Sequence, residues 1–321
     1  MIMRLSLSTA LALALTATAC AREAETETEA STESAAASAA TTAVATSVQE
    51  EAVTAYDFPE DAWRDLDPEN TLYIETDHGR IVVELAPEFA PAHVDRMKSL
   101  ARERFYDFLV WHRVIDGFMA QGGGSRANAN HRADLPGLQA EFTVQRGAEL
   151  EISELMDRQV SPSIPQVGKA GFWNSFPAGT QPIAQSMITA TGQVASWLLH
   201  CQGAAAMART NDPNSAGSQF YITRGDAEHL NASYTVWGRV RYGQDAVNNI
   251  AVGTYQQDPG FTPDLIRSMR VEAELPEAER TNVQVVDTDH PSFAAYLETL
   301  RDTSGALPDV CAIDIPTRIQ D

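Results

Sequence analysis

Two stretches of this sequence hold the side chains best suited to chemistry at a shared site. The first runs from residue 111 to 123 and includes Arg113, Phe118, Met119 and Gln121. The second runs from residue 207 to 222 and includes Ala208, Arg209, Gln219 and Tyr221. Arginine offers a planar, permanently charged set of N–H donors, and glutamine offers donors and acceptors. Beside an apolar pocket, such groups can bind a substrate and stabilise a developing charge without a nucleophile.

Nucleophilic and metal-dependent chemistry are not indicated by the sequence. His229 could act as a general base, but no serine or cysteine in a nucleophile setting accompanies it. The three cysteines form no Cys-x-x-Cys pair and no His/Cys cluster at ligand spacing, so we expect no metal and no other cofactor. A net charge of −21 argues against nucleic-acid binding, which requires clustered Lys and Arg.

Residues 1–20 have the layout of a bacterial signal peptide. Arg4 gives a short positive region, and the apolar run at 5–19 is too short for a comfortable transmembrane helix. Residues 17–20 also resemble a lipobox, at which the chain is cleaved and Cys20 is acylated. Ala17 stands where Leu is usual, so plain secretion without lipidation is the alternative. We expect a periplasmic protein held at a membrane by a lipid on Cys20.

Residues 21–55 consist almost wholly of Ala, Thr, Glu and Ser and contain few large apolar residues. Such a segment cannot bury enough surface to offset its chain entropy, so we expect a disordered tether. The folded part should begin near residue 56, with a domain over 56–276 and a C-terminal extension over 277–321.

Hydrophobic periodicity predicts a mainly β domain. A hairpin is expected over 70–86, because apolar residues alternate on both sides of a turn at 77–79. Helical spacing follows Pro91 to about residue 103, and a second helix is expected over 243–252. Further strands are predicted at 110–114, 118–121, 205–209, 219–223, 234–240 and 267–274.

Two segments do not follow this pattern. Residues 144–199 contain several prolines and glycines and scattered aromatic residues, which predict a large, irregular but ordered insertion. The extension contains one helical candidate at 291–301. The aromatic residues of the insertion could enlarge a binding groove or pack the insertion onto the domain, and we favour packing.

The stretches around residues 111–123 and 207–222 resemble the cyclophilin family of prolyl isomerases. The first block includes residues 105–107 and 112–123, and the second is residues 207–222; weaker similarity lies at 87–91 and 236–240. Together the resemblance covers about 70–142 and 203–272. It implies a cyclophilin-like, eight-stranded, closed antiparallel β-barrel capped by two helices, with its substrate in a groove outside the filled barrel.

The resemblance also implies the roles of particular residues. Arg113 matches the catalytic arginine, which donates toward the prolyl nitrogen; a surface salt bridge is the alternative. Phe118, Met119, Tyr221 and Leu230 match the pocket for the proline ring, although apolar strand residues more often belong to a core. The remaining matches hold the substrate main chain or line the groove: Gln121, Ala208, Arg209 and Gln219. Gln219 could instead brace a loop.

Three positions depart from the best-known members of the family. Tyr221 stands where Phe is common, which keeps the ring and adds a hydroxyl. His229 replaces a Trp associated with cyclosporin binding, and Tyr234 replaces a groove His. The last two changes put drug sensitivity in doubt more than activity.

The expected function is catalysed isomerisation of X–Pro bonds in polypeptides that fold outside the cytoplasm. Peptide-bond rotation has a barrier of ~18–20 kcal/mol, and X–Pro bonds already populate the cis form, so a catalyst need only lower the barrier. A tethered module that binds proline-containing segments, with incidental catalysis, is the alternative. An oxidising compartment would also permit a disulfide between Cys201 and Cys311, and the sequence leaves this pairing open.

Overall fold

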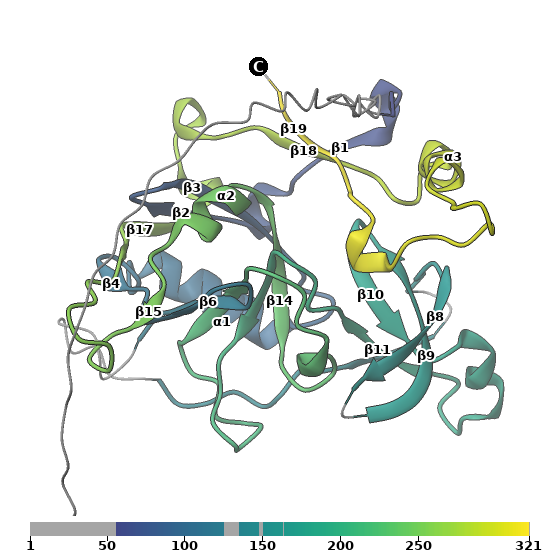
Figure 1. Ribbon diagram of the computed structural model, residues 1–321, viewed down its shortest axis with the longest axis horizontal. Helices are drawn as coiled ribbons and strands as arrows, with labels where there is room; N and C mark the ends of the chain where they lie inside the picture. Colours follow the sequence, from purple (N-terminus) through teal and green to yellow (C-terminus); the bar gives the residue numbers. More distant parts are fainter. Residues whose placement is uncertain (1–55, 125–134, 148–149, 163, 321) are drawn as a thin grey trace, which may run out of the picture. The chain divides into compact units, whose positions relative to one another are not determined.

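The computed structural model describes residues 56–124, 135–147, 150–162 and 164–320. The predicted signal peptide, the tether and Cys20 lie outside the described residues. Within these ranges, no helix is long and apolar enough to cross a membrane. Figure 1 shows that strands dominate the described part of the chain and that the helices are few and short, which confirms the predicted mainly β class.

Nine strands form one antiparallel sheet, in the spatial order β15-β5-β6-β13-β12-β14-β3-β2-β17. In chain order they are β2 (Thr71–Thr76), β3 (Gly79–Leu85), β5 (Arg113–Ile115), β6 (Met119–Gly122), β12 (Ala204–Met207), β13 (Phe220–Thr223), β14 (Val236–Tyr242), β15 (Gly253–Thr254) and β17 (Ser268–Val271). Strands β2 and β3 are the predicted hairpin, and Thr76 pairs with Gly79 at its turn. Gly79 has a φ of 121°, which L-residues rarely adopt.

Two short strands link the segment before β5, next to one end of this order, with the segment before β17 at the other end. Strand β4 (Leu109–Val110) precedes β5, strand β16 (Leu265–Ile266) precedes β17, and the two pair with each other. Phe108 N–H also donates to the carbonyl of Ile266, at 2.7 Å. The curled antiparallel sheet agrees with a cyclophilin-like architecture, and full closure into an eight-stranded barrel stays a prediction.

Two helices accompany the nine-stranded sheet, as expected. Helix α1 (Pro91–Arg102) has proline in its first turn, where the missing N–H has no helical acceptor to lose. Helix α2 (Gln244–Asn249) ends earlier than predicted, because the backbone at Ile250 leaves the helical region. The main core is made of side chains from the sheet and both helices; its largest members are Tyr106, Trp111, Phe220 and Trp237.

The prediction of an irregular insertion was wrong. Residues 144–199 form a second antiparallel sheet, in the order β7-β11-β10-β9-β8. Its strands are β7 (Val144–Arg146), β8 (Met156–Ser161), β9 (Ile164–Trp173), β10 (Phe176–Thr180) and β11 (Val194–Leu198). The glycines that suggested irregularity allow close packing inside strands. A Cβ on Gly179 would lie 2.4 Å from Nε1 of Trp197, and one on Gly171 would lie 1.6 Å from the carbonyl of Ser153.

The segments that flank the cyclophilin-like region form a third sheet. Strand β18 lies between β1 and β19, both antiparallel to it. The bounds are β1 (Trp63–Asp65), β18 (Val283–Val286) and β19 (Thr317–Ile319), and helix α3 (Pro291–Thr299) occupies the predicted helical segment. Short 3₁₀ turns complete the fold: η1 (Glu60–Ala62), η2 (Pro68–Asn70), η3 (Ile183–Ile188), η4 (Glu228–Leu230), η5 (Glu272–Glu274), η6 (Glu277–Glu279) and η7 (Val310–Ala312).

A second hydrophobic core contains side chains from residues 58–66, from the insertion and from the C-terminal extension. It includes Phe58 before β1, Phe172 and Trp197 of the insertion, and Phe293 of α3. The outer face of the β2–β3 hairpin contributes Tyr73 and Val82 to the same cluster. The insertion and the extension therefore pack together on the hairpin, which is consequently buried on both faces.

A disulfide joins Cys201, which follows the insertion, to Cys311 in the extension. The two sulfurs and a carboxylate oxygen of Asp226 lie within 4.8 Å of one another. Because both sulfurs are bonded to each other, neither is a thiolate that could ligate a metal. The bond thus links the extension covalently to the start of the second cyclophilin-like block.

The buried carboxylate of Glu84 binds two arginines that in turn contact the insertion. Glu84 on β3 accepts hydrogen bonds from Arg64 on β1 at 2.7 Å and from Arg241 on β14 at 2.6 Å. Both arginines also donate to the turn between β9 and β10, to the carbonyls of Asn174 and Ser175. Burial opposes ionisation of Glu84, but the two guanidinium groups outweigh it and hold its pKa below the ordinary value.

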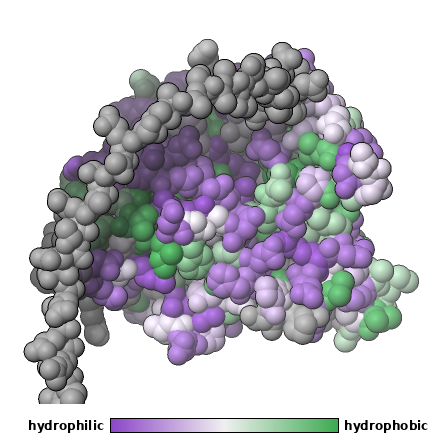
Figure 2. All heavy atoms as spheres, viewed as in Figure 1, coloured by the Kyte–Doolittle hydropathy of each residue, from purple (hydrophilic) through white to green (hydrophobic). Residues whose placement is uncertain are grey.

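Hydrophilic side chains cover most of the molecular face in Figure 2, and hydrophobic ones gather in small separate groups. Among the described residues, the most exposed large apolar side chains are Met187 and Ile188 on η3, each 87% exposed. Scattered apolar residues of this kind are normal on a protein surface, but an adjacent pair at the end of a 3₁₀ turn is a candidate contact point.

Candidate functional site

Ten residues predicted from the sequence line one cavity of about 330 Å³. They come from both cyclophilin-like blocks and from the segment that follows the second: Arg113, Phe118, Met119, Gln121, Ala208, Arg209, Tyr221, His229, Leu230 and Tyr234. Gln219, the remaining predicted residue, lies directly behind Gln121. The structure therefore brings the predicted groove residues together, although their segments are far apart in the chain.

The register of three neighbouring strands aligns the polar and apolar parts of this cavity. Arg113 on β5 is paired with Gln121 on β6, and Gln121 is paired with Tyr221 on β13. Directly paired residues of antiparallel strands point to the same face of a sheet. Arg113, Gln121 and Tyr221 consequently form a row across the sheet. The turn η4 brings Leu230 to the same face from beyond β13.

A polar relay occupies one side of the cavity. Arg113 Nη1 donates to Oε1 of Gln121 at 3.3 Å, and Nε2 of Gln121 donates to Oε1 of Gln219 at 3.1 Å. Within the described part of the chain, this is the one hydrogen bond of the half-buried Arg113 guanidinium, which has five N–H donors. Gln121 thereby holds the guanidinium group at the wall of the cavity.

Apolar side chains form the other side. Met119 is 2% exposed, and Tyr221 and Leu230 are buried beside it. Phe118 is half-buried, and its ring lies 5.4 Å from the exposed ring of His229. The dimensions and composition suit a small apolar ring flanked by a polar main chain.

The insertion supports this apolar side from behind. Ile152, Phe176 and Leu198 belong to the same buried cluster as Met119 and Tyr221. The aromatic residues of the insertion that are fully buried are Phe172, Phe176 and Trp197, and Trp173 packs edge-on against Phe89 with ring centroids 4.9 Å apart. The prediction that these residues pack the insertion onto the domain is confirmed.

Arg209 is held along the rim by a contact that the sequence did not reveal. Its guanidinium lies 4.2 Å from the centre of the Tyr234 ring and 5.3 Å from that of Phe142. It also donates to the carbonyl of Ser233 through Nη2, at 2.9 Å. Phe142 precedes the insertion in the sequence, and no pattern there indicates that it returns to the groove.

Two further residues missed by the sequence analysis lie behind the pocket. His200 Nε2 is 3.0 Å from the hydroxyl of Tyr221, and its Nδ1 is 3.2 Å from Oδ1 of Asn231. Burial lowers the pKa of His200 to about 4, so its ring is neutral at ordinary pH. Burial also raises the pKa of Tyr221 well above 10, which keeps its hydroxyl protonated. Neither His200 nor Asn231 lies in a recognised motif.

Nothing in this geometry supports hydrolysis. None of the ten described residues that line the cavity is Ser, Thr or Cys, and His229 faces a phenyl ring. A general base without a nucleophile or an oriented acceptor does not complete a catalytic arrangement. The site is built to bind an apolar ring and to donate hydrogen bonds.

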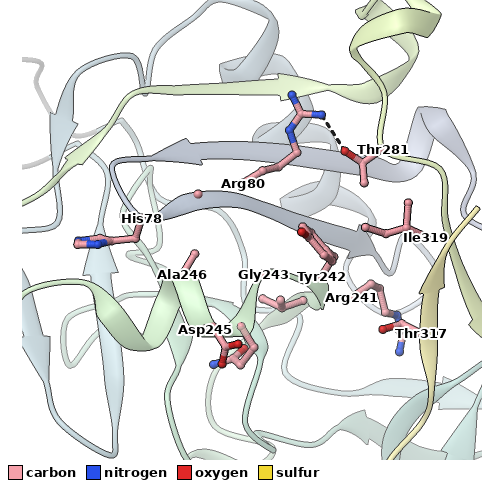
Figure 3. A pocket seen from close by; sticks show the side chains of 13 residues that line it. His78, Arg80, Arg241, Tyr242, Gly243, Asp245, Ala246, Thr281, Thr317 and Ile319 are labelled. Atoms are coloured by element: carbon pink, nitrogen blue, oxygen red, sulfur yellow. Dashed lines mark hydrogen bonds between the residues drawn. The ribbon is translucent and has the colours of Figure 1, made fainter. Parts of the chain in front are cut away.

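A larger cavity, of about 660 Å³, lies elsewhere, between the β2–β3 turn, α2 and β19 (Figure 3). Figure 3 shows Arg80 directed toward Thr281, to which it donates at 2.9 Å. Arg80 is also paired with Glu75, and Arg241 with Glu84. Each guanidinium group is thus neutralised by a carboxylate. This cavity is therefore the weaker candidate for chemistry, although it is larger.

Comparisons with known proteins also point to the smaller cavity as the functional site, because the matched family region contains all of its lining residues. A family model for "Cyclophilin type peptidyl-prolyl cis-trans isomerase/CLD" matches residues 71–271. A Brucella suis protein named "Probable peptidyl-prolyl cis-trans isomerase" is 31% identical over 209 residues, which are 65% of this chain and 85% of that protein. A peptidyl-prolyl cis-trans isomerase of Acinetobacter baylyi is 28% identical over 188 residues, covering 57% of this chain and 72% of the relative.

A solved structure extends the likeness beyond the matched family region. The crystal structure of cyclophilin AquaCyp293 from Hirschia baltica has a TM-score of 0.69 and 30% sequence identity, and the match covers 82% of this chain and 98% of that one. The family model alone spans more than half of the sequence and contains every residue of the cavity. This chain therefore belongs to the cyclophilin-type peptidyl-prolyl cis-trans isomerases and is an isomerase.

Proposed function

We propose that the enzyme isomerises X–Pro bonds of polypeptides that fold outside the cytoplasm, and that Arg113 is its catalytic residue. The observation that carries this proposal is the row formed by Arg113, Gln121 and Tyr221 across three paired strands. In such a row the N–H donors of Arg113 would lie beside the apolar side chains that line the same cavity.

The chemistry follows from what the reaction requires. Rotation about the X–Pro bond removes amide resonance, so the prolyl nitrogen regains a lone pair in the twisted transition state. A donor directed at that nitrogen binds the transition state more tightly than either planar ground state, which lowers the barrier. Met119, Leu230 and Phe118 hold the ring, while Gln121 and the segment at 208–209 bind the main chain.

Measured isomerisation of a short proline peptide tests the role of Arg113. The assay follows cis–trans exchange by NMR without a coupled protease, using wild type, Arg113→Ala and Arg113→Lys. We expect Arg113→Ala to lower kcat/KM about 100-fold, the order found when a single transition-state donor is removed. Arg113→Lys keeps the charge but loses the planar fork, and should recover only a small part of the activity. Equal rates for wild type and Arg113→Ala would refute the mechanism.

Two observations support a role outside the cytoplasm. The sequence begins with a segment typical of a signal peptide, and Cys201 and Cys311 form a disulfide, which persists in oxidising compartments. We propose that Cys20 carries a lipid and that residues 21–55 tether the enzyme to a membrane, where it acts on newly exported chains.

Fractionation of cells that express the full-length chain tests the anchor. We expect wild type in the membrane fraction, labelled by a radioactive fatty acid and cleaved before Cys20, and Cys20→Ser without label. Fatty-acid label on Cys20→Ser, or unlabelled wild type, would contradict the proposal. Isomerase activity should be the same for both, because Cys20 is remote in sequence from all residues of the cavity.

One observation favours a second candidate function, the binding of unfolded clients, to which catalysis would be incidental. Met187 and Ile188 expose an apolar pair on η3, and flexible apolar residues of this kind can bind varied partners. The double substitution Met187→Ser with Ile188→Ser tests this. Unchanged isomerisation of a short peptide together with lost suppression of client aggregation would support a separate binding role. Unchanged suppression of client aggregation would refute this binding role of Met187 and Ile188.

A further inference from the structure

A buried chain of three side chains lies behind the floor of the proline pocket. It runs from Tyr221 through His200 to Asn231, with separations of 3.0 Å and 3.2 Å between the bonded atoms. His200 and Asn231 are each 1% exposed, and Tyr221 is 4% exposed. Because all three polar groups are removed from water, each depends on its neighbour for a hydrogen-bond partner.

The direction of every hydrogen bond in this chain is determined. The backbone N–H of His200 donates to Oδ1 of Asn231 at 2.8 Å, which identifies that atom as the carbonyl oxygen of the amide. A carbonyl oxygen only accepts, so the proton of the neutral His200 ring must be on Nδ1. Nε2 is then the acceptor, and the hydroxyl of Tyr221 donates to it.

The three residues come from different parts of the fold. Tyr221 is on β13 of the nine-stranded sheet, His200 follows β11 of the insertion, and Asn231 follows η4. The rings of His200 and Tyr221 are nearly parallel, with an angle of 19° between them. Tyr234 packs edge-on against both, at 6.5 Å from His200 and 6.1 Å from Tyr221. The Tyr221 ring is thus fixed at its edge and at its hydroxyl.

We propose that His200 is a positioning residue of the isomerase, which accepts the hydroxyl hydrogen of Tyr221 and thereby holds the Tyr221 ring in place as the floor of the proline pocket. The inference rests on the proposed site in so far as Tyr221 binds the proline ring. It explains how a tyrosine serves at a position where phenylalanine is common in the family. The hydroxyl is directed away from the substrate and is satisfied from behind, so the surface offered to the proline ring stays apolar.

Without this acceptor, the hydroxyl would have to find another partner. A buried donor that loses its partner is costly, so the ring would tilt or admit a water molecule to recover a hydrogen bond. Either response changes the floor on which the proline ring rests. The effect should appear in the affinity for substrate, because the donor Arg113 lies on the other side of the cavity and is untouched.

The test is a double-mutant cycle read out by peptide affinity and by kinetics. His200→Met keeps a similar volume but places no nitrogen acceptor at the Nε2 position, and His200→Gln can supply an amide oxygen there. Both changes are made in the wild-type chain and in Tyr221→Phe, whose ring has no hydroxyl to satisfy. The probe is the tetrapeptide Ala-Ala-Pro-Phe, with its Kd measured by NMR titration and kcat and KM by NMR exchange.

We expect His200→Met to weaken Kd and KM about ten-fold, with kcat within about two-fold of wild type. His200→Gln should recover most of the affinity. In the Tyr221→Phe chain, His200→Met should change Kd by less than about two-fold, since the hydrogen bond is already absent. An equal loss in both backgrounds would show that His200 acts only through the fold and would overturn the proposal. Unchanged affinity of His200→Met in the wild-type chain would overturn it as well.

A second measurement needs no substitution of His200. A buried tyrosine hydroxyl that donates to a ring nitrogen exchanges slowly, so the unaltered enzyme should give a Tyr221 hydroxyl proton signal coupled to ¹⁵N at Nε2 of His200. A clear signal coupled to another acceptor, or no protected hydroxyl signal at all, would refute the proposed contact even where His200→Met fails to fold. Arg113→Ala, measured in parallel, separates the two proposals. If Arg113→Ala loses activity but keeps its Kd for the peptide, the His200 cycle can still be interpreted from Kd. If Arg113→Ala keeps its activity, only the catalytic role of Arg113 is refuted.

Discussion

The nine-stranded and five-stranded sheets meet at one buried cluster but contribute differently to it. The first sheet supplies Met119 and Tyr221 and carries the row of Arg113, Gln121 and Tyr221 that lines the cavity. The second supplies Phe176 and Leu198 from behind and places no residue among the ten that line the cavity. The difference suggests that changes in the first sheet are felt in catalysis, whereas changes in the second are felt in stability and substrate affinity.

The largest effect on stability is expected at Glu84, which joins the two sheets. Glu84→Gln leaves Arg241 buried without its carboxylate and should lower the free energy of unfolding by about 3–5 kcal/mol. Urea unfolding monitored by tryptophan fluorescence measures this. Glu75→Gln is the matched control, because its partner Arg80 is more exposed and the pair should contribute at most about 1 kcal/mol. Equal losses for the two variants would remove the special role of the junction.

Removal of the disulfide should separate stability from catalysis. Cys201→Ala with Cys311→Ala frees a loop of 110 residues in the unfolded chain, and we expect a loss of about 2–4 kcal/mol. Activity per folded molecule should remain within about two-fold of wild type at 25 °C. A reductant should lower the Tm of wild type and leave that of the double variant unchanged. A large fall in kcat of the double variant would contradict the proposal that changes outside the nine-stranded sheet affect stability and not catalysis.

The pH dependence of stability should report on His200. Its pKa is about 4 in the folded state, below the ordinary value of about 6.5, so the unfolded state takes up the proton first. Stability contributed by the neutral ring is therefore complete above pH 6.5 and is lost as pH falls toward 4, by roughly 3 kcal/mol at most.

Unfolding measured between pH 7 and 4 should be less pH-dependent in His200→Gln than in wild type. Some dependence will remain, because burial also lowers the pKa of His93 and its partner Glu141 only partly offsets this. Glu84 also contributes to the pH dependence, but as a carboxylate that must stay ionised. Its stabilising contribution is lost only at lower pH, since its pKa is held below 4.5 in the folded protein. Identical slopes for the two proteins would contradict a buried neutral His200.

The smallest change is expected at Gly179 in the second sheet. Gly179→Ala places a methyl group against the Trp197 indole and should cost about 1–3 kcal/mol, with kcat unchanged. Combining it with Trp197→Phe removes the ring atoms that the methyl group meets, so the double variant should be more stable than the sum of the single effects predicts. Thermal unfolding of the four proteins gives the coupling. Strict additivity would show that the close approach does not limit packing.

The sequence predicted the first sheet and the cavity better than it predicted the second sheet. Alternation identified Leu72 and Ile74 as core residues because strand side chains point to opposite faces with a period of two. It did not show that the second face, with Tyr73 and Val82, is buried as well. That burial depends on the insertion and on segments before residue 71 and after residue 271, which no local pattern connects to the hairpin.

Proline and glycine caused the main error. In the insertion they were interpreted as breakers, yet Pro177 lies within β10 and Gly179 lies beside an indole ring. His200 and Asn231 were missed for a related reason. Their function depends on a contact made across the fold, and neither residue type nor spacing in the chain indicates it.

The separation of Cys201 and Cys311 has a consequence for biosynthesis. A chain made from its N-terminus presents Cys201 while 110 further residues still have to be synthesised before its partner exists. All nine strands of the nine-stranded sheet precede Cys311, so that sheet can pair completely before the disulfide forms. During this interval the one other thiol in the sequence is Cys20. Its proposed acylation would therefore do more than anchor the enzyme, because it removes the competitor with which Cys201 could form a wrong bond.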